Sequence, residues 1–344
     1  MITDINRSSP TFNDIFEIQI DVTSYCNSFC GSCIRNINGG PLNPRVKLEH
    51  MSWTVWKHII EYCKKYSVST LSFNGNYGDL SNHPEIIEML EYLYSQTPGI
   101  AMTIHTNGGA RNIQFWKDLA TITKKFPSTM VVFSIDGLED TNHVYRRGVK
   151  FDSIMENANS FISAGGNARW RMIVFDHNKH QIQEASQLAR AMKFCAFNLN
   201  RSFSASIEVD KYKEFPQEVI TAPSSSVVNE LNSLYAYSSN ESKNNVVRLS
   251  RTSGSKCPWQ QELKIQINQL GEVWPCCYLS MASAHPSKIR FNWLDEKKIE
   301  YGEGFNNLKY FTLTEILDHP FFQNYLPNTF ENNPLIICKE RCNL

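Results

Sequence analysis

The sequence lacks the features that mark membrane, secreted and nucleic-acid-binding proteins. Its 344 residues include no run of about 18 apolar residues, and the N-terminus shows no signal-peptide pattern. Lys plus Arg and Asp plus Glu both number 34, and a net charge of zero argues against a dominant surface for nucleic acid or anionic lipid. The composition, 42% hydrophobic and 20% charged, is typical of a globular protein. We therefore expect a cytoplasmic protein without membrane or nucleic-acid partners.

Disulfide bonds are not expected in a reducing cytoplasm, so the ten cysteines are better explained as metal ligands. Three of them cluster near the start of the chain and five near its end. The remaining two, Cys63 and Cys195, stand alone, and each is interpreted as a small buried apolar residue.

Strand and helix patterns alternate over the first two hundred residues. Helical patterns lie between six β-rich runs, at residues 16–22, 70–73, 101–106, 130–136, 170–175 and 196–199. This alternation predicts an α/β fold with a parallel sheet and outer helices, either a partial (β/α)6 barrel or a doubly wound sheet. In both folds, functional groups gather at the C-terminal ends of the strands.

Serine-rich polar segments interrupt this alternation and predict the domain organisation. We expect a barrel domain at residues 1–221, a polar connecting region at 222–256 and a small C-terminal α+β domain at 257–344. Within the last domain, residues 263–274 are predicted to form a β-hairpin, and residues 313–325 a helix that Pro320 interrupts.

The first cysteine set, Cys26, Cys30 and Cys33, has the spacing C-x3-C-x2-C and follows the first predicted strand. Three thiolates can hold three irons of a 4Fe–4S cubane and leave the fourth iron without a protein ligand. The alternatives are a zinc site or a chance spacing. Zinc normally takes four protein ligands in a structural site, and no fourth Cys or His is adjacent.

This cysteine spacing after a first strand resembles the signature of the radical S-adenosylmethionine (SAM) superfamily. The resemblance implies that SAM chelates the open iron through its amino and carboxylate groups. It also implies that an electron donor, a reductase or a flavodoxin or ferredoxin, drives SAM cleavage to a 5′-deoxyadenosyl radical. Many members place an aromatic residue before the third cysteine, where this chain has Ser32.

Further segments resemble the SAM-binding segments of the family, in the same order. Where many members carry Gly-Gly-Glu-Pro, this chain has Gly75, Gly78 and Asp79, with a plain turn as the alternative. Thr106 and Asn107 close the third strand. Ser134, Asp136 and Arg147 match the Ser-x-Asp-Gly…Arg-Gly stretch of the SPASM and twitch branch.

The family resemblance assigns these residues to SAM binding. Arg147 aligns best with a partner for the SAM carboxylate, and Arg146 is expected to be solvated. Arg171, inside the fifth strand, faces either SAM or an internal carboxylate. For Leu199, adenine packing and a plain core position are both open, with the core the simpler interpretation.

The C-terminal cysteines resemble the opening of SPASM and twitch domains. Thirteen residues separate Cys257 from Gly271, and four more precede Cys276. The twitch pattern implies one auxiliary cluster, 4Fe–4S or 2Fe–2S, on four cysteines: Cys257, Cys276, Cys338 and Cys342. Cys277 is the expected non-ligand, because neighbouring residues of an extended arm point to opposite sides. A four-cysteine zinc site is the alternative.

Taken together, the motifs predict a radical SAM oxidoreductase that oxidises or dehydrogenates a small molecule with help from an auxiliary cluster. Peptide or protein modification is the alternative within the same family. A non-catalytic iron–sulfur or zinc protein is the alternative from another class.

Overall fold

A computed structural model describes residues 15–239, 257–284 and 292–342. The chain divides into two compact units, and each is considered by itself. One comprises Met1–Ile20, Met51–Ser72 and Asn245–Leu344, and the other Asp21–His50 and Phe73–Asn244. Within the described residues, no helix has the length and apolar character needed to cross a membrane. Residues 240–256 of the predicted connecting region lie outside the described residues.

The second unit is built on parallel strands that alternate with helices. The strands β3 (Ala101–Thr106), β4 (Thr129–Ser134), β5 (Ala168–Val174) and β6 (Ala196–Arg201) lie side by side in this order. The short strand β9 (Tyr237–Ser238) pairs antiparallel with β6. The helices are α2 (Ile86–Gln96), α3 (Ile113–Thr123), α4 (Asn142–Tyr145), α5 (Phe151–Ser163) and α6 (Ile182–Ala191), with 3-10 turns at Leu80–Asn82 and Lys179–Gln181.

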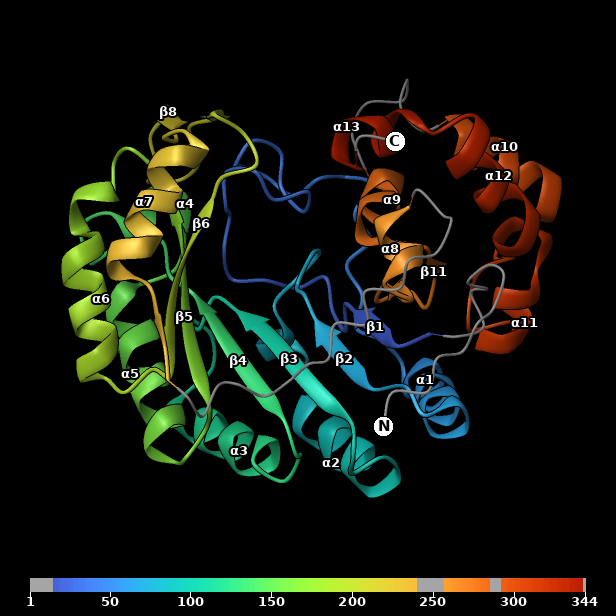
Figure 1. The fold of residues 1–344 in the computed structure, drawn as a ribbon, viewed down its shortest axis with the longest axis horizontal. Coiled ribbons are helices and arrows are strands. Elements are labelled where there is room, and N and C mark those ends of the chain that lie inside the picture. Colours follow the sequence, from blue (N-terminus) through green and yellow to red (C-terminus); the bar gives the residue numbers. More distant parts are fainter. Residues whose placement is uncertain (1–14, 240–256, 285–291, 343–344) are drawn as a thin grey trace. The chain divides into compact units, whose positions relative to one another are not determined.

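Aromatic side chains form the core between these strands and helices. Phe133 of β4 packs against Trp116 of α3 and Phe161 of α5, at ring distances of 5.3 and 5.9 Å. Trp170 of β5 lies 5.8 Å from Phe197 of β6. Because strand residues alternate between faces, the residues on either side of Phe133 and Trp170 point away from the helices. Figure 1 shows α3, α5 and α6 along one face of these strands.

The first unit contains the remaining strands of the sheet. The strands β1 (Glu17–Ile20), β2 (Thr70–Phe73, whose last residue belongs to the second unit), β10 (Lys264–Ile267) and β11 (Val273–Trp274) follow the order β11-β10-β1-β2. The helices are α1 (Trp53–Tyr66), α8 (Pro258–Gln261), α9 (Cys277–Ser283), α10 (Asn292–Tyr301), α11 (Leu313–Asp318), α12 (Leu326–Asn332) and α13 (Ile336–Cys342), with a π-helical turn at Phe321–Tyr325.

The predicted α/β fold with parallel strands is confirmed, and so are its six main strands. Within each unit these main strands follow one another in chain order without the reversal of a doubly wound sheet, which favours the partial-barrel alternative. The predicted N-cap of α1 is present, since Ser52 Oγ accepts from Val55 N at 3.4 Å. The C-terminal hairpin is formed by β10 and β11, and the predicted break falls between α11 and Phe321.

Two elements were not predicted. A two-stranded antiparallel sheet, β7 (Ser206–Val209) and β8 (Glu218–Thr221), follows β6. The described part of the predicted connecting region carries α7 (Ser225–Tyr235), and Asn232 of this helix exchanges hydrogen bonds with the backbone of Leu199. The boundaries predicted for a separate C-terminal domain remain a prediction.

Candidate functional site

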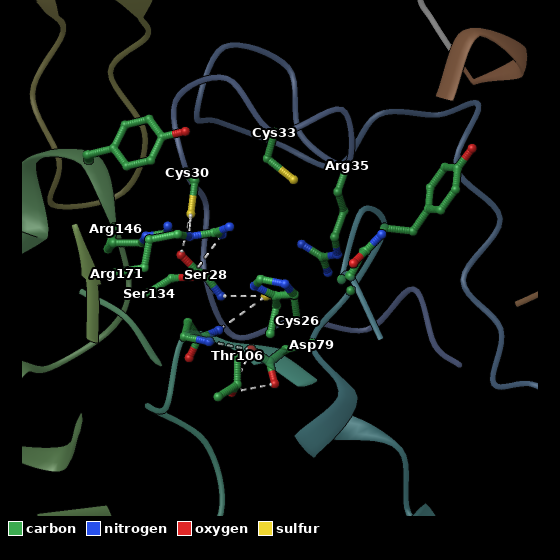
Figure 2. Close-up of a pocket in the computed structure, with 17 residues that line it drawn as sticks. Cys26, Ser28, Cys30, Cys33, Arg35, Asp79, Thr106, Ser134, Arg146 and Arg171 are labelled. Carbon is green, nitrogen blue, oxygen red and sulfur yellow. Dashed lines mark hydrogen bonds between the residues drawn. The ribbon is translucent and has the colours of Figure 1, made fainter. Parts of the chain in front are cut away.

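The first three cysteines surround a single cavity in the second unit. Cys26, Cys30 and Cys33 line a cavity of about 160 Å³, and Figure 2 shows Arg146 and Arg171 on one side of it and Arg35 on the other. Ser28 joins two of the thiols, because its backbone N–H donates to Cys26 Sγ at 3.4 Å and its hydroxyl lies 3.0 Å from Cys30 Sγ. The sequence motif therefore brings its thiols together around space for a bound group.

Most of the predicted SAM-binding residues line the same cavity. They are Gly75, Gly78, Asp79, Thr106, Asn107, Ser134 and Arg171. The sequence analysis did not anticipate several further lining residues, which are Ser28, Arg35, Asn74, Tyr77, His105 and Tyr145. Arg146 also lines it, although the sequence suggested a solvated position. Asp136, Arg147 and Leu199 are not among the lining residues.

Asp79 and the glycines before it organise the wall of the cavity. The buried Asp79 carboxylate accepts from Ser81 N at 3.0 Å, from Thr106 Oγ1 at 2.9 Å and from Asn107 N at 2.6 Å. It therefore ties the end of β3 to the turn after β2. A Cβ atom on Gly78 would come within 2.6 Å of the Tyr25 carbonyl oxygen, so glycine is needed here for close approach to the cysteine loop.

A buried ion pair places a cation beside the cysteines. Arg146 Nε lies 2.6 Å from Asp136 Oδ2, and Arg146 Nη1 donates to Cys30 Sγ at 3.6 Å. Burial lowers the pKa of this guanidinium, but Asp136 and Cys30 together raise it above its ordinary value, so Arg146 stays charged. Asp136, which the sequence assigned to SAM, is fully buried and instead orients Arg146.

The thiols themselves are strongly affected by burial. Burial raises the pKa of Cys26 above its ordinary range, and burial together with Cys30 raises the pKa of Cys33 to about 11. Without a positively charged partner such thiols hold their protons, so a metal that binds them as thiolates displaces those protons. The donor set, three thiols beside one guanidinium, fits a negatively charged iron–sulfur cluster.

Arg147 does not occupy the position that the sequence suggested. Its guanidinium is 0% exposed and donates to the carbonyl oxygens of Asp210 and Pro216, both at 2.6 Å. It also lies 3.4 Å from a carboxylate oxygen of Glu218. Arg147 therefore holds the β7–β8 hairpin rather than a ligand in the cavity. Two adjacent arginines give the sequence no sign of which one points inward.

The hairpin that Arg147 holds covers the cysteine loop. Ile207, Val209 and Ile220 of the hairpin form one apolar cluster with Cys30 and with the aromatic rings of Tyr145 and Phe175. A Cβ atom on Gly31 would come within 2.6 Å of Val209 Cγ1, so the hairpin contacts the loop directly. The hairpin thus packs next to the thiol that is most buried of the three.

We expect Arg147→Ala to destabilise the protein while leaving SAM binding to the folded form nearly unchanged. The substitution leaves two buried carbonyl oxygens without their charged donor, which should cost about 3 kcal/mol of unfolding free energy. Urea denaturation measures this loss, and Arg201→Ala, at an exposed arginine on β6, is the matched control. Unchanged stability together with lost SAM affinity would return Arg147 to the cofactor site.

The C-terminal cysteines converge on a second cavity, in the first unit. Cys257, Cys276, Cys338 and Cys342 line it together with apolar and aromatic side chains, whereas Cys277 does not. The latter two lining cysteines lie one turn apart on α13, where side chains at i and i+4 share a face.

Burial and mutual proximity shape the chemistry of these four thiols. Burial, together with the neighbouring cysteines, raises the pKa of Cys338 to about 12, and burial raises that of Cys257 to about 11. Across the residues that the structure describes, no group of three or more His, Cys, Asp or Glu side chains is arranged to hold a single metal ion. The donor set of four thiols fits the auxiliary cluster predicted from the sequence.

Leu199 agrees with the simpler of its two predicted roles. It is 5% exposed on β6, and its backbone N–H and carbonyl both bind the Asn232 side chain. It does not line the cysteine cavity. These contacts describe a core residue.

The comparison with protein families decides what kind of domain holds the first cavity. The model of the radical SAM superfamily matches residues 20–189, a range that contains every residue lining the cavity. Residues 20–189 form a radical SAM domain. The superfamily uses a 4Fe–4S cluster and SAM, and its members are enzymes. The four C-terminal cysteines lie outside the matched range of this radical SAM domain.

Solved structures share the fold of this radical SAM protein at low sequence identity. SuiB of Streptococcus suis bound to S-adenosylmethionine matches with a TM-score of 0.56 and 19% identity, over 77% of this chain and 61% of SuiB. The enzyme anSMEcpe with bound AdoMet matches with a TM-score of 0.57 and 14% identity, over 90% of this chain and 79% of anSMEcpe. The chain thus spans less than two thirds of SuiB. No curated protein sequence matches it significantly.

Proposed function

We propose that this radical SAM enzyme cleaves SAM reductively and uses the resulting radical to oxidise its substrate. The observation that carries the proposal is the convergence of Cys26, Cys30 and Cys33 on one cavity that also contains Arg146 and Arg171. Three thiols and two guanidinium groups suit a cluster with one open iron and a ligand that bears a carboxylate.

The residues of the cavity have distinct proposed roles. When bound, the cluster and SAM supply a 5′-deoxyadenosyl radical that abstracts a hydrogen atom from the substrate. The three cysteines hold the cluster, and Arg146 balances its negative charge beside Cys30. Arg171, which lies 3.3 Å from Ser134 Oγ and has no carboxylate partner in the described residues, binds the SAM carboxylate. Gly75, Gly78, Asp79, Thr106 and Asn107 shape the wall around SAM.

The C-terminal cysteines support the proposal of a net oxidation. Four thiols around one cavity would ligate an auxiliary cluster completely, so the substrate would not coordinate it. The four cysteines would then position a group that accepts an electron from the substrate radical. This arrangement corresponds to the twitch type of C-terminal domain, with a 4Fe–4S or 2Fe–2S cluster.

Two substrate classes remain candidates within this proposal. A small molecule that is oxidised or dehydrogenated is the first. A peptide is the second, since SuiB has been solved bound to the precursor peptide SuiA and anSMEcpe with a Cp18Cys peptide. A flavodoxin, ferredoxin or other reductase as electron donor and a cytoplasmic location complete the proposal.

Metal content and SAM cleavage test the proposed function directly. Protein reconstituted without oxygen should contain about eight irons per chain as two 4Fe–4S clusters, or about six if the auxiliary cluster is 2Fe–2S. With SAM and a strong reductant it should form 5′-deoxyadenosine and methionine. Metal analysis and chromatography measure both. Zinc at both cysteine sets, with no 5′-deoxyadenosine, would support the non-catalytic alternative.

A further inference from the structure

A row of side chains crosses three parallel strands on the face that points away from the helices. His105 of β3 pairs in register with Val132 of β4, and Val132 pairs with Arg169 of β5. Register partners in a parallel sheet point to the same side. Since Phe133 and Trp170 face the helices, these three residues face the opposite side. His105 also lines the cavity of the radical SAM domain.

The polar groups in this row have no partners among the described residues. His105 Nδ1 and Arg169 Nε are both buried atoms without a hydrogen bond. The nearby acids are already engaged, since Asp136 pairs with Arg146 and Asp21 accepts from the backbone and side chain of Asn76. A buried guanidinium without an anion is costly, because water no longer compensates its charge.

The electrostatic environment of His105 is positive. Burial, together with the charges of Arg171 and Arg169, lowers the pKa of His105 to about 3. The ring is therefore neutral at pH 7 and can donate one hydrogen bond. Val132, between the two polar residues, and Ala196, the register partner of Arg169 on β6, are small and leave space above them.

We propose that the row His105–Val132–Arg169 binds an acidic group of the substrate, a carboxylate or a phosphate. The proposal rests on the proposed function, and it adds that the substrate is an anion. Strand spacing separates β3 from β5 by about 10 Å, a gap that the long Arg169 side chain and an oxyanion can span together. The oxyanion would accept from the Arg169 guanidinium and from the His105 ring.

The next row along the strands suits SAM instead. Arg171 and its register partner Ser134 lie two residues further toward the C-terminal ends of β5 and β4, about 7 Å along the strand. Both line the cavity with the cysteines, whereas Arg169 does not. The two arginines of β5 therefore serve two different acids, Arg171 the SAM carboxylate and Arg169 the substrate.

Anion binding by the cluster-loaded, SAM-saturated protein tests this assignment. Isothermal titration without oxygen, at constant ionic strength in chloride, uses malonate and inorganic phosphate as separate probes. We expect one of them to bind with a stoichiometry of one, and which one does so separates carboxylate from phosphate. Arg169→Gln should weaken that binding by about tenfold or more without changing SAM affinity.

Three further variants sharpen the test. Arg171→Gln should weaken SAM more than the anion, and Arg201→Gln, at an exposed arginine of β6, should change neither. Arg169→Lys keeps the charge, so it should bind the anion more tightly than Arg169→Gln, and its thermal midpoint reports on folding. The proposal is overturned if neither probe binds the wild type, or if Arg169→Gln weakens SAM as much as the anion. Failure to form 5′-deoxyadenosine while anion binding persists counts against the proposed function alone.

Discussion

Replacing Cys30 by alanine is expected to abolish SAM cleavage. Cys30 is 8% exposed, and its sulfur lies beside Ser28 Oγ and receives a hydrogen bond from Arg146. With one of three thiolates missing, the cubane is no longer held, and the open iron that SAM needs is lost. Formation of 5′-deoxyadenosine should fall below detection, and iron should drop from about eight to about four per chain.

A second buried cysteine provides the control for this experiment. Cys63 on α1 is 2% exposed and lines neither of the two cysteine cavities. Cys63→Ala should therefore keep both the iron content and SAM cleavage, although a small cavity lowers stability. If Cys30→Ala still formed 5′-deoxyadenosine at the wild-type rate, the cluster would have to be held elsewhere.

Removing Cys338 and Cys342 together should separate SAM cleavage from completion of the product. Both cysteines line the second cavity from one face of α13, so Cys338→Ala/Cys342→Ala leaves only two of four ligands. The variant should contain about four irons and still form 5′-deoxyadenosine. The substrate radical would then lack its electron acceptor, so the oxidised product should be lost or replaced by a reduced by-product.

Cys277 supplies the matched control for the second cavity. It is the neighbour of Cys276 but does not line the cavity, so Cys277→Ala should retain full iron and product. Circular dichroism and retained SAM binding must show that the double variant is folded, because metal binding and folding are coupled. Full product from a folded double variant would make the second cluster structural and would remove the main support for oxidation.

The sequence predicted the elements of the fold more completely than the directions of single side chains. Apolar alternation and cysteine spacing are local patterns, so the strands and both cysteine sets could be found without coordinates. The inward direction of Arg146 rather than Arg147 depends on where the β7–β8 hairpin offers its carbonyl groups. That hairpin was missed, although Ile207, Val209 and Ile220 alternate with polar residues, because its strands are only four residues long.

Register is the other property that the sequence did not contain. Nothing in the chain near His105 indicates that Arg169, more than sixty positions later, lies in the same row. That row exists because β3, β4 and β5 pair in parallel with fixed offsets. Glycine 78 shows the same limit, since its need for close approach was foreseen but its neighbour is the cysteine loop itself.

The pairing of β1 with β10 limits how this enzyme can be divided or recombined. Glu17–Ile20 runs parallel to Lys264–Ile267, with Lys264 Nζ 3.1 Å from a Glu17 carboxylate oxygen. A chain cut at residue 256 would expose the edge of β1, whose isoleucines are fully buried in the intact protein. Bare apolar edges pair with other chains and aggregate. The strand that leads into the first cysteine set thus depends on the C-terminal segment, and grafting that segment between relatives would require the matching β1.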